Sequence, residues 1–210
     1  MNYYLGDPHF HYEEMITRCN RPFTSVDEMN QTIIDNINGR CTSEDKLIIV
    51  GDVSVGEKYV VPLLRQINCE KILVIGNHDR IQLGHKSFRD CFESFHEALL
   101  ITDGEYDLFI SHFPHAEWDG YYKGRFHFYG HVHNSKSGGA ALMSLLPTAV
   151  NTCADVNNFA PQTADELISK RLKEFANKSH DMDALLDNIL HPVVDDRATK
   201  KLDMAKLFGI

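Results

Sequence analysis

The stretch KILVIGNHD, residues 71–79, runs from an apolar segment into a glycine that is followed by an amide, an imidazole and a carboxylate. A short apolar run bounded by a turn signal predicts a buried strand, here over residues 72–75. Polar side chains directly behind a buried strand gather at one edge of a sheet, where ligands commonly bind. The stretch therefore predicts a central strand with a chemically active end.

Similar polar clusters follow other apolar runs along the chain. They are Asp7-Pro8-His9, Gly51-Asp52, Ser111-His112 and Gly130-His131-Val132-His133. Ligands at positions i and i+2 point the same way on an extended backbone, so each His-x-His or Asp-x-His pair is expected to face one centre. The glycines that precede the clusters are expected to let the chain turn sharply and approach an anion closely.

The segments between these clusters predict alternating strands and helices in the first part of the chain. Residues 3–5 and 47–50 predict strands, and a capping box from Ser25 to Glu28 with a stop at Gly39 predicts a helix between them. Residues 57–67 predict a second helix, in which Pro62 must lie in the first turn or introduce a kink. The later segments predict a short helix over 86–92, a hairpin over 98–110, strands over 126–129 and 148–156, and a helix that begins at a capping box at Thr163.

This order of elements predicts the fold class. Helices and strands alternate early and strands follow one another later, which favours an α/β (α+β) fold of four layers, with two mixed sheets flanked by helices. A chain of 210 residues with 43% hydrophobic content is sufficient for one core. We expect one domain over residues 1–178, with residues 179–210 as a helical C-terminal extension packed on that domain; a partner-binding arm is the alternative for this extension.

Composition narrows the classes of function. The net charge of −9 argues against a broad basic surface for nucleic acid. The five cysteines are scattered and form no Cys-x-x-Cys pair, which predicts neither a disulfide framework nor a structural zinc site. The N-terminus lacks the features of a signal peptide, and no segment approaches the roughly 20 apolar residues of a membrane span. We therefore expect a cytoplasmic protein without a membrane partner.

The polar clusters together offer two carboxylates, four imidazoles and one amide oxygen. These candidate ligands are Asp7, His9, Asp52, Asn77, His112, His131 and His133. One cation does not need seven ligands, but two cations that share Asp52 would each have about four protein ligands. Oxygen and imidazole ligands without thiolate favour Mn, which we place first, or Fe, Zn, Co or Ni. Two divalent ions and two carboxylates leave a net charge of +2, which favours an anionic ligand such as phosphate.

This constellation resembles the calcineurin-like metallophosphoesterase superfamily. The five blocks of its signature are Asp-x-His, Gly-Asp, Gly-Asn-His-Asp/Glu, His and Gly-His-x-His, and all five occur in order between Asp7 and His133. Residues 20–25 and 151–157 are also similar to a group of small bacterial and phage members. Those members tend to have Asp-x-His-Phe-Gly-His, whereas this chain has Tyr12 at the position of the second family histidine.

The resemblance implies a metallophosphoesterase fold and a division of the ligands between two metal ions. The first ion would be held by Asp7, His9, Asp52 and His133, and the second by Asp52, Asn77, His112 and His131. A hydroxide that bridges the ions would attack phosphorus in line. His78 would remain unligated and stabilise charge or protonate the departing oxygen. Asp79 would be a further catalytic-site residue that orients the loop or His78.

Two arginines next to the blocks, Arg21 and Arg80, are candidates for phosphate or substrate contacts, because a guanidinium matches phosphate oxygens. Surface ion pairing is the alternative for both. His11 and His115 are close to the blocks in sequence and are candidates to line the site. An aromatic segment, Trp118 with Tyr121 and Tyr122, either stacks on a base of the substrate or packs locally.

The leading hypothesis is a phosphodiesterase that acts on a nucleotide or a nucleic-acid-like diester. A phosphomonoesterase or protein phosphatase is the alternative within the same chemistry. The alternative from another class is a non-catalytic metal-binding scaffold of the same fold. A missing ligand would favour the scaffold, but every block is intact. The natural substrate and the oligomeric state do not follow from the sequence.

Overall fold

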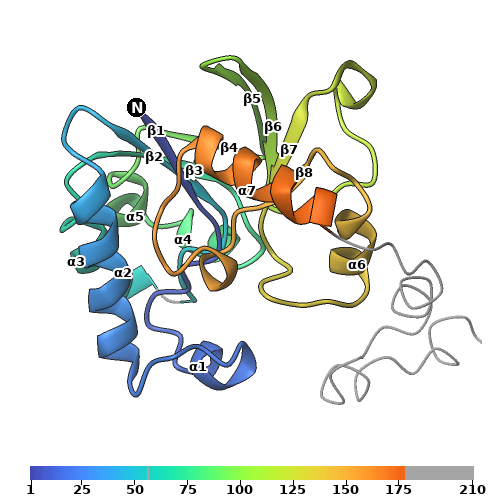
Figure 1. The fold of residues 1–210 in the computed structure, drawn as a ribbon. Coiled ribbons are helices and arrows are strands. Elements are labelled where there is room, and N and C mark those ends of the chain that lie inside the picture. The colour runs from blue at the N-terminus through green and yellow to red at the C-terminus, as the bar shows by residue number, and fades with distance from the viewer. Residues whose placement is uncertain (56, 178–210) are drawn as a thin grey trace, which may run out of the picture.

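The structure is a computed structural model, and it describes residues 1–55 and 57–177. The helical extension predicted for residues 179–210 lies outside the described residues. Two four-stranded sheets form the centre of the molecule (Figure 1). Of the helices in the described part of the chain, none combines the length and apolar character needed to cross a bilayer.

The first sheet is parallel throughout. Its strands lie in the order β1 (Asn2–Leu5), β2 (Lys46–Val50), β3 (Glu70–Val74) and β4 (Ser94–His96). Alternate side chains of β2 enter two different cores, Leu47 and Ile49 on one face and Ile48 and Val50 on the other. Burial of both faces explains the continuous apolar runs in the sequence. The three-residue strand β4 was not predicted.

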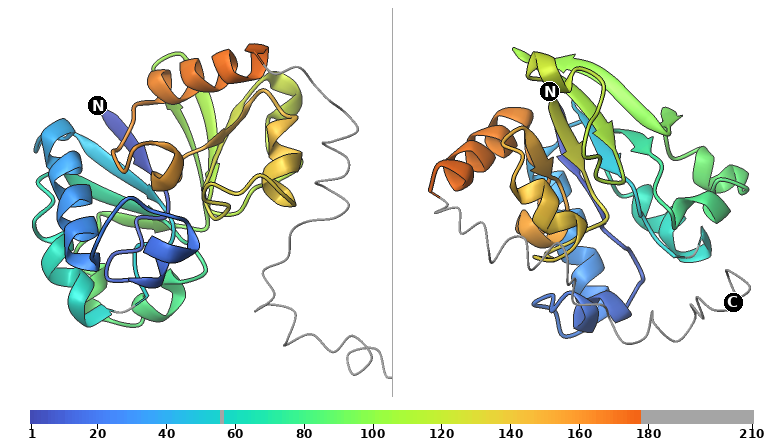
Figure 2. Two further views of the ribbon diagram at one scale, coloured as in Figure 1. Left: turned by 60° about the horizontal axis from the view of Figure 1, so that its bottom comes forward. Right: turned by 90° about the vertical axis from the view of Figure 1, so that its right-hand side faces the viewer.

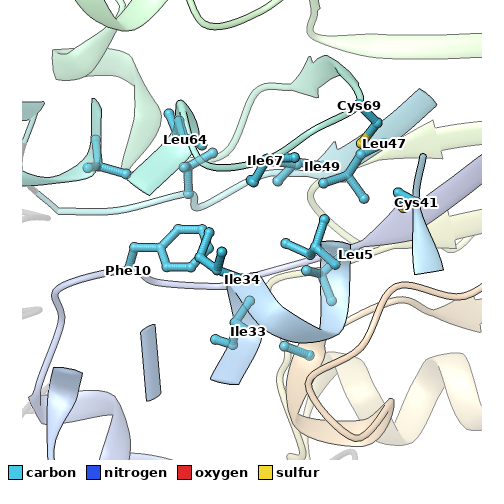
Figure 3. Close-up of a cluster of buried hydrophobic side chains, with 14 of the residues drawn as sticks. Leu5, Phe10, Ile33, Ile34, Cys41, Leu47, Ile49, Leu64, Ile67 and Cys69 are labelled. Carbon is cyan, nitrogen blue, oxygen red and sulfur yellow. The ribbon is translucent and has the colours of Figure 1, made fainter. Parts of the chain in front are cut away.

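Helices cover the outer face of the first sheet. They are α2 (Val26–Arg40), α3 (Glu57–Leu64) and α5 (Lys86–Arg89), and their apolar side chains pack against the sheet (Figure 3). The hydroxyl of Ser25 accepts a hydrogen bond from the backbone N–H of Glu28 at 3.2 Å, which confirms the predicted cap. The predicted stop at Gly39 was wrong by one position, because α2 continues to Arg40. Pro62 lies inside α3 and not in its first turn.

The second sheet is mixed. Its strands lie in the order β5 (Ala98–Asp103), β6 (Tyr106–Ser111), β7 (Phe126–Tyr129) and β8 (Ala149–Asn151). Strands β5 and β6 form the predicted antiparallel hairpin, whereas β6, β7 and β8 are parallel. The strand predicted over residues 148–156 is shorter than expected, because the chain leaves β8 and forms the short helix η2 (Ala154–Val156) beside the ligand clusters.

The two sheets face each other across a second apolar core, which α7 (Ala164–Asn177) completes by packing along β1 and β8 (Figure 2). The predicted capping box is present, since the Thr163 hydroxyl and the Glu166 carboxylate each accept a hydrogen bond from the other residue's backbone N–H. Outside the second sheet lie α6 (Gly139–Ser144) and Trp118. These four layers confirm the predicted fold class, but the prediction of two mixed sheets was wrong for the first sheet, in which every strand pair is parallel. The remaining short elements are α1 (Glu14–Arg18), α4 (Asp79–Gln82) and η1 (Tyr121–Lys123).

Candidate metal centre

The predicted ligand clusters of both sheets meet at the carboxyl ends of their strands. Asp7 follows β1, Asp52 follows β2 and Asn77 follows β3, while His112 and His131 follow β6 and β7. The backbone links the two sheets at this edge, since the N–H of His131 donates to Asp7 Oδ2 at 2.8 Å. The strand-end rule explains the position of the clusters within each sheet, and the packing of the two sheets brings both sets to one site.

One group of ligands, which we name the enclosed group, consists of Asp7, His9 and His133. One ligand atom of each residue lies within 4.8 Å of the other two. Asp7 Oδ1 is 3.8 Å from His9 Nε2 and 3.7 Å from His133 Nε2, which is too far for direct hydrogen bonds. Asp7 Oδ1 and His9 Nε2 are buried and find no hydrogen-bond partner in residues 1–55 and 57–177. Buried polar atoms normally have partners, so this arrangement fits a cation between them.

The second group, which we name the open group, consists of Asp52, His112 and His131, whose ligand atoms also lie within 4.8 Å of one another. Asp52 Oδ2 is 3.4 Å from His112 Nε2 and 3.6 Å from His9 Nε2, so it lies between the two groups. Asn77 Oδ1 is 3.0 Å from His112 Nε2. The side chains of Asn77 and His131 are exposed, and this half of the centre therefore faces solvent.

The backbone at the ligands is unusual. Five of the seven predicted ligands have a positive φ angle: Asp7 (55°), His9 (52°), Asp52 (53°), His131 (70°) and His133 (49°). Each such conformation costs about 1–3 kcal/mol in a residue other than glycine and is typically retained at functional sites. The expectation that the i and i+2 pairs converge on an extended backbone was wrong, because both members of each pair are left-handed.

Two glycines are required by close packing against the ligands. A Cβ atom on Gly51 would lie 2.2 Å from His112 Nδ1, and a Cβ on Gly76 would lie 2.3 Å from Asp52 Oδ1. Gly51 also has a φ angle of 80°, which favours glycine. These glycines make room for the ligand side chains themselves, which the sequence did not indicate.

Burial and charge shift the pKa values of the ligands in opposite directions. Burial alone would raise the pKa of Asp52, but its hydrogen bond with His112 and the charge of that ring lower it to about 2. Burial would lower the pKa of His112, yet Asp52 and Asp7 raise it to about 9. Burial raises the pKa of Asp7 and lowers that of His9 well below its ordinary value. The shift of His9 favours the neutral imidazole, the form in which a histidine binds a metal.

The carboxylate of Asp79 binds the backbone of two loops that carry candidate ligands. Its buried carboxylate accepts hydrogen bonds from the backbone N–H groups of Gly76, Asp52 and Val53, each at 2.8 Å. Burial raises the pKa of Asp79 to about 6, although these three hydrogen bonds oppose the shift. The carboxylate ties the loop after β2 to the loop after β3, so its geometry is that of a residue that positions Asp52.

His78 borders the centre without belonging to either group. Its backbone N–H donates to Asp52 Oδ1 at 2.8 Å, and its Nε2 lies 4.0 Å from Asp52 Oδ2. The ring is also 5.4 Å from the ring of His9 and 6.1 Å from that of Tyr12. The side chain is 37% exposed, so one edge of the ring faces the ligands and the ring remains accessible to solvent.

Both candidate arginines have carboxylate partners. The guanidinium of Arg21 is buried and pairs with Asp155 at 2.9 Å. Arg80 lies on the surface and pairs with Glu97 at 2.9 Å. Arg80 thus forms the surface ion pair that was the alternative, whereas the ion pair of Arg21 is buried and not on the surface. The predicted contacts of both arginines with substrate stay predictions.

Sequence reasoning missed two residues that support the ligands. Asp155 Oδ2 is 2.8 Å from His133 Nδ1, and Cys153 Sγ donates to Asp7 Oδ2 at 3.1 Å. Both residues lie just beyond β8, so the rule that located the other clusters also applied to them. Carboxylates and thiols that contact metal ligands orient those ligands and tune their basicity.

Other residues singled out from the sequence have local partners. His11 Nδ1 is 3.2 Å from the side-chain amide of Asn30 on α2. The ring of His115 packs on His127, and the indole N–H of the buried Trp118 donates to a backbone carbonyl at 2.9 Å. Trp118 therefore packs locally, whereas Tyr122 is 83% exposed.

No family model matches the chain. Its sequence is 28% identical over 169 residues to the uncharacterized protein MJ1445 of Methanocaldococcus jannaschii, which covers 79% of this chain and 88% of the other. A protein of unknown function from Aquifex aeolicus, AQ665, has a similar structure, with a TM-score of 0.65 and 22% identity over 81% of this chain and 98% of that one. The nuclease MPE of Pseudomonas putida aligns with a TM-score of 0.43 and 18% identity, over 63% of this chain and 60% of the nuclease. The fold of this chain is therefore shared with the Aquifex protein.

Proposed function

We propose that this chain is a dinuclear metal-dependent phosphoesterase of the calcineurin-like type, and that its substrate is a phosphodiester in a nucleotide or a nucleic-acid-like molecule. The observation that carries the proposal is the position of Asp52 Oδ2 between the enclosed and open groups, 3.6 Å from His9 Nε2 and 3.4 Å from His112 Nε2. Two divalent ions beside Asp7 and Asp52 would give the centre a net charge of +2. Such a centre attracts a phosphate group.

In this proposal, the enclosed group and the open group each provide most of the ligands of one metal ion. The enclosed group with Asp52 would hold one ion, and the open group with Asn77 would hold the other. When bound, the two ions lower the pKa of coordinated water and neutralise charge on the phosphoryl oxygens. Manganese is our first choice, and the same oxygen and imidazole ligands suit Fe, Zn, Co and Ni.

His78 is the proposed proton donor. It contacts the centre through Asp52 but belongs to neither ligand group, so its ring nitrogen remains available to a substrate. A protonated imidazole at this place would donate its proton to the departing oxygen, as a general acid does. Its exposed side gives the leaving group a route to solvent.

The pairing of the two candidate arginines supports a diester over a monoester. A phosphomonoester carries up to two negative charges at neutral pH, while a phosphodiester carries one. Arg21 and Arg80, the two arginines next to the blocks, are both paired with carboxylates. Neither is set up to balance a second substrate charge, so the second charge of a monoester would have to be balanced by the metal ions alone.

The test compares two substrates. Protein stripped of metal and reloaded with Mn²⁺ is assayed against bis-p-nitrophenyl phosphate and p-nitrophenyl phosphate, with Asp52→Asn as the control. Faster cleavage of the diester is expected, and the Asp52→Asn variant should lose about 10³-fold in kcat/KM, since a metal ion contributes several kcal/mol to such a reaction. A preference for the monoester would indicate a phosphatase. No cleavage of either substrate with any metal, in a protein that binds two ions, would favour the non-catalytic metal-binding scaffold.

A further inference from the structure

Arg21 is buried beneath the enclosed group, and all five of its N–H groups are used. Its Nε and one Nη donate to the two carboxylate oxygens of Asp155 at 2.9 and 3.1 Å. The same Nη also donates to the backbone carbonyl of Asp7 at 2.9 Å, and the other Nη donates to the carbonyl of Pro8 at 2.8 Å and to the sulfur of Met29 at 3.3 Å. A guanidinium that is satisfied in this way serves the fold around it.

The carbonyls that Arg21 binds belong to a strained loop. Asp7 and His9 flank Pro8 and have φ angles of 55° and 52°. Left-handed residues other than glycine persist only where the surrounding structure holds them in place. Two charge-assisted hydrogen bonds from one buried guanidinium supply such support. Arg21 therefore holds the backbone that presents two members of the enclosed group.

Asp155 extends the same contact to the third member. Its Oδ2 accepts from Arg21 and also lies 2.8 Å from His133 Nδ1. A hydrogen bond between Nδ1–H and a carboxylate fixes the orientation of an imidazole and leaves Nε2 as the atom that faces a metal. His133 Nε2 is indeed the atom that faces Asp7 Oδ1. One ion pair thus contacts both loops of the enclosed group.

We propose that Arg21 and Asp155 are positioning residues that together set the geometry of the enclosed group, and so the affinity of one of the two metal sites. This inference rests on the proposed function, because it assumes that the enclosed group binds a metal. Cys19 also offers a ligand atom within 4.8 Å of His133 and Asp155. That arrangement is a poor cation site, because Arg21 and His133 already bind the oxygens of Asp155.

The test measures metal binding and not turnover alone. Metal-free wild type and the variants Asp155→Asn and Arg21→Lys are titrated with Mn²⁺ and with Co²⁺ by calorimetry and visible absorption. The variants should bind one of the two ions about 10- to 100-fold more weakly and the other ion with unchanged affinity. The double variant Arg21→Gln with Asp155→Asn removes both charges of the ion pair, so neither partner is left unpaired, and it should show the same selective loss if a single variant does not fold.

Arg40→Gln is the matched control, since Arg40 forms a partly exposed ion pair with Glu166 at 2.6 Å, between α2 and α7. It should leave both metal affinities unchanged. Equal weakening of both sites, or no change in either, in the folded Arg21 and Asp155 variants would overturn the positioning role. NMR of the metal-free protein gives an independent readout: an exchange-protected Nδ1 proton on His133 is expected in wild type and should be lost in Asp155→Ala.

If the wild-type protein binds no metal, the proposed function fails, and the NMR signal still reports whether Asp155 holds His133. If wild type binds two ions but the Nδ1 proton of His133 exchanges as freely as in Asp155→Ala, the proposed function stands and the positioning role fails. The two proposals are therefore separated by these measurements.

Discussion

The enclosed and open groups offer similar ligand atoms in different surroundings. In the enclosed group, Asp7 and His9 are buried; Cys153 and Arg21 donate hydrogen bonds to Asp7, and Asp155 contacts His133. In the open group, Asp52 and His112 are equally buried, but His131 is exposed, and its ring packs on the half-exposed Phe113 at 4.5 Å. Under the proposed function, the enclosed group would be held by the fold around it, and the exposed side of the open group would meet the substrate.

The strongest test of this comparison concerns the residue beneath Asp52, the ligand that both halves share. Asp79→Ala leaves three buried backbone N–H groups without their acceptor, at about 1–3 kcal/mol each. The free energy of unfolding in urea should fall by about 4 kcal/mol, and both metal affinities should fall with it. Asp79→Asn keeps one acceptor oxygen and should lose less. Weakening of only one metal site would show that Asp79 does not support the shared ligand.

The free energy of unfolding should depend on pH through a histidine that is not a candidate ligand. His127 is buried on the second sheet, where its Nε2 accepts from the His115 N–H and its Nδ1 faces the Phe109 carbonyl. Burial lowers the pKa of His127 to about 4, so the folded protein keeps this ring neutral. Its contribution to stability is present above the unfolded pKa of about 6.5, and about 3 kcal/mol is lost as the pH falls through about 4.

His127→Gln, whose amide can replace both hydrogen bonds, should flatten this pH dependence. The measurement is urea unfolding of the metal-free protein between pH 7 and pH 4. A variant with the same slope as wild type would place the acid-sensitive group elsewhere, for example among the ligands.

Replacement of His78 separates chemistry from metal binding. His78→Gln should lower kcat by about 10²-fold, because a positioned general acid contributes about that factor. Metal content in both halves should remain two ions per chain, measured by atomic emission. A variant that loses a metal ion would instead show that His78 is a ligand.

The smallest expected effect falls on the enclosed group alone. Cys153→Ala removes the donor to Asp7 Oδ2 and should weaken one metal site about tenfold. Cys153→Ser keeps a donor and should restore most of the affinity. An equal effect on both sites, seen by calorimetry, would contradict the distinction between the two halves.

The strands at the centre and the ligand clusters behind them were predictable from the sequence. Short apolar runs that end in glycine and polar residues are local features, and parallel strands place their carboxyl ends at one edge. The capping boxes of α2 and α7 are equally local, since each involves residues three positions apart. The sequence alone therefore determined the order of elements, the identity of the candidate ligands and the kind of chemistry that they favour.

Only the tertiary structure decided how the ligands are held. Arg21 and Asp155 are 134 positions apart in the chain, and no local spacing connects them. The left-handed backbone of Asp7, His9 and Asp52 likewise depends on contacts with distant carbonyls, amides and side chains. Such contacts form only when two sheets pack at a particular register, and the free energy of that packing is a property of the whole fold and not of any short stretch of sequence.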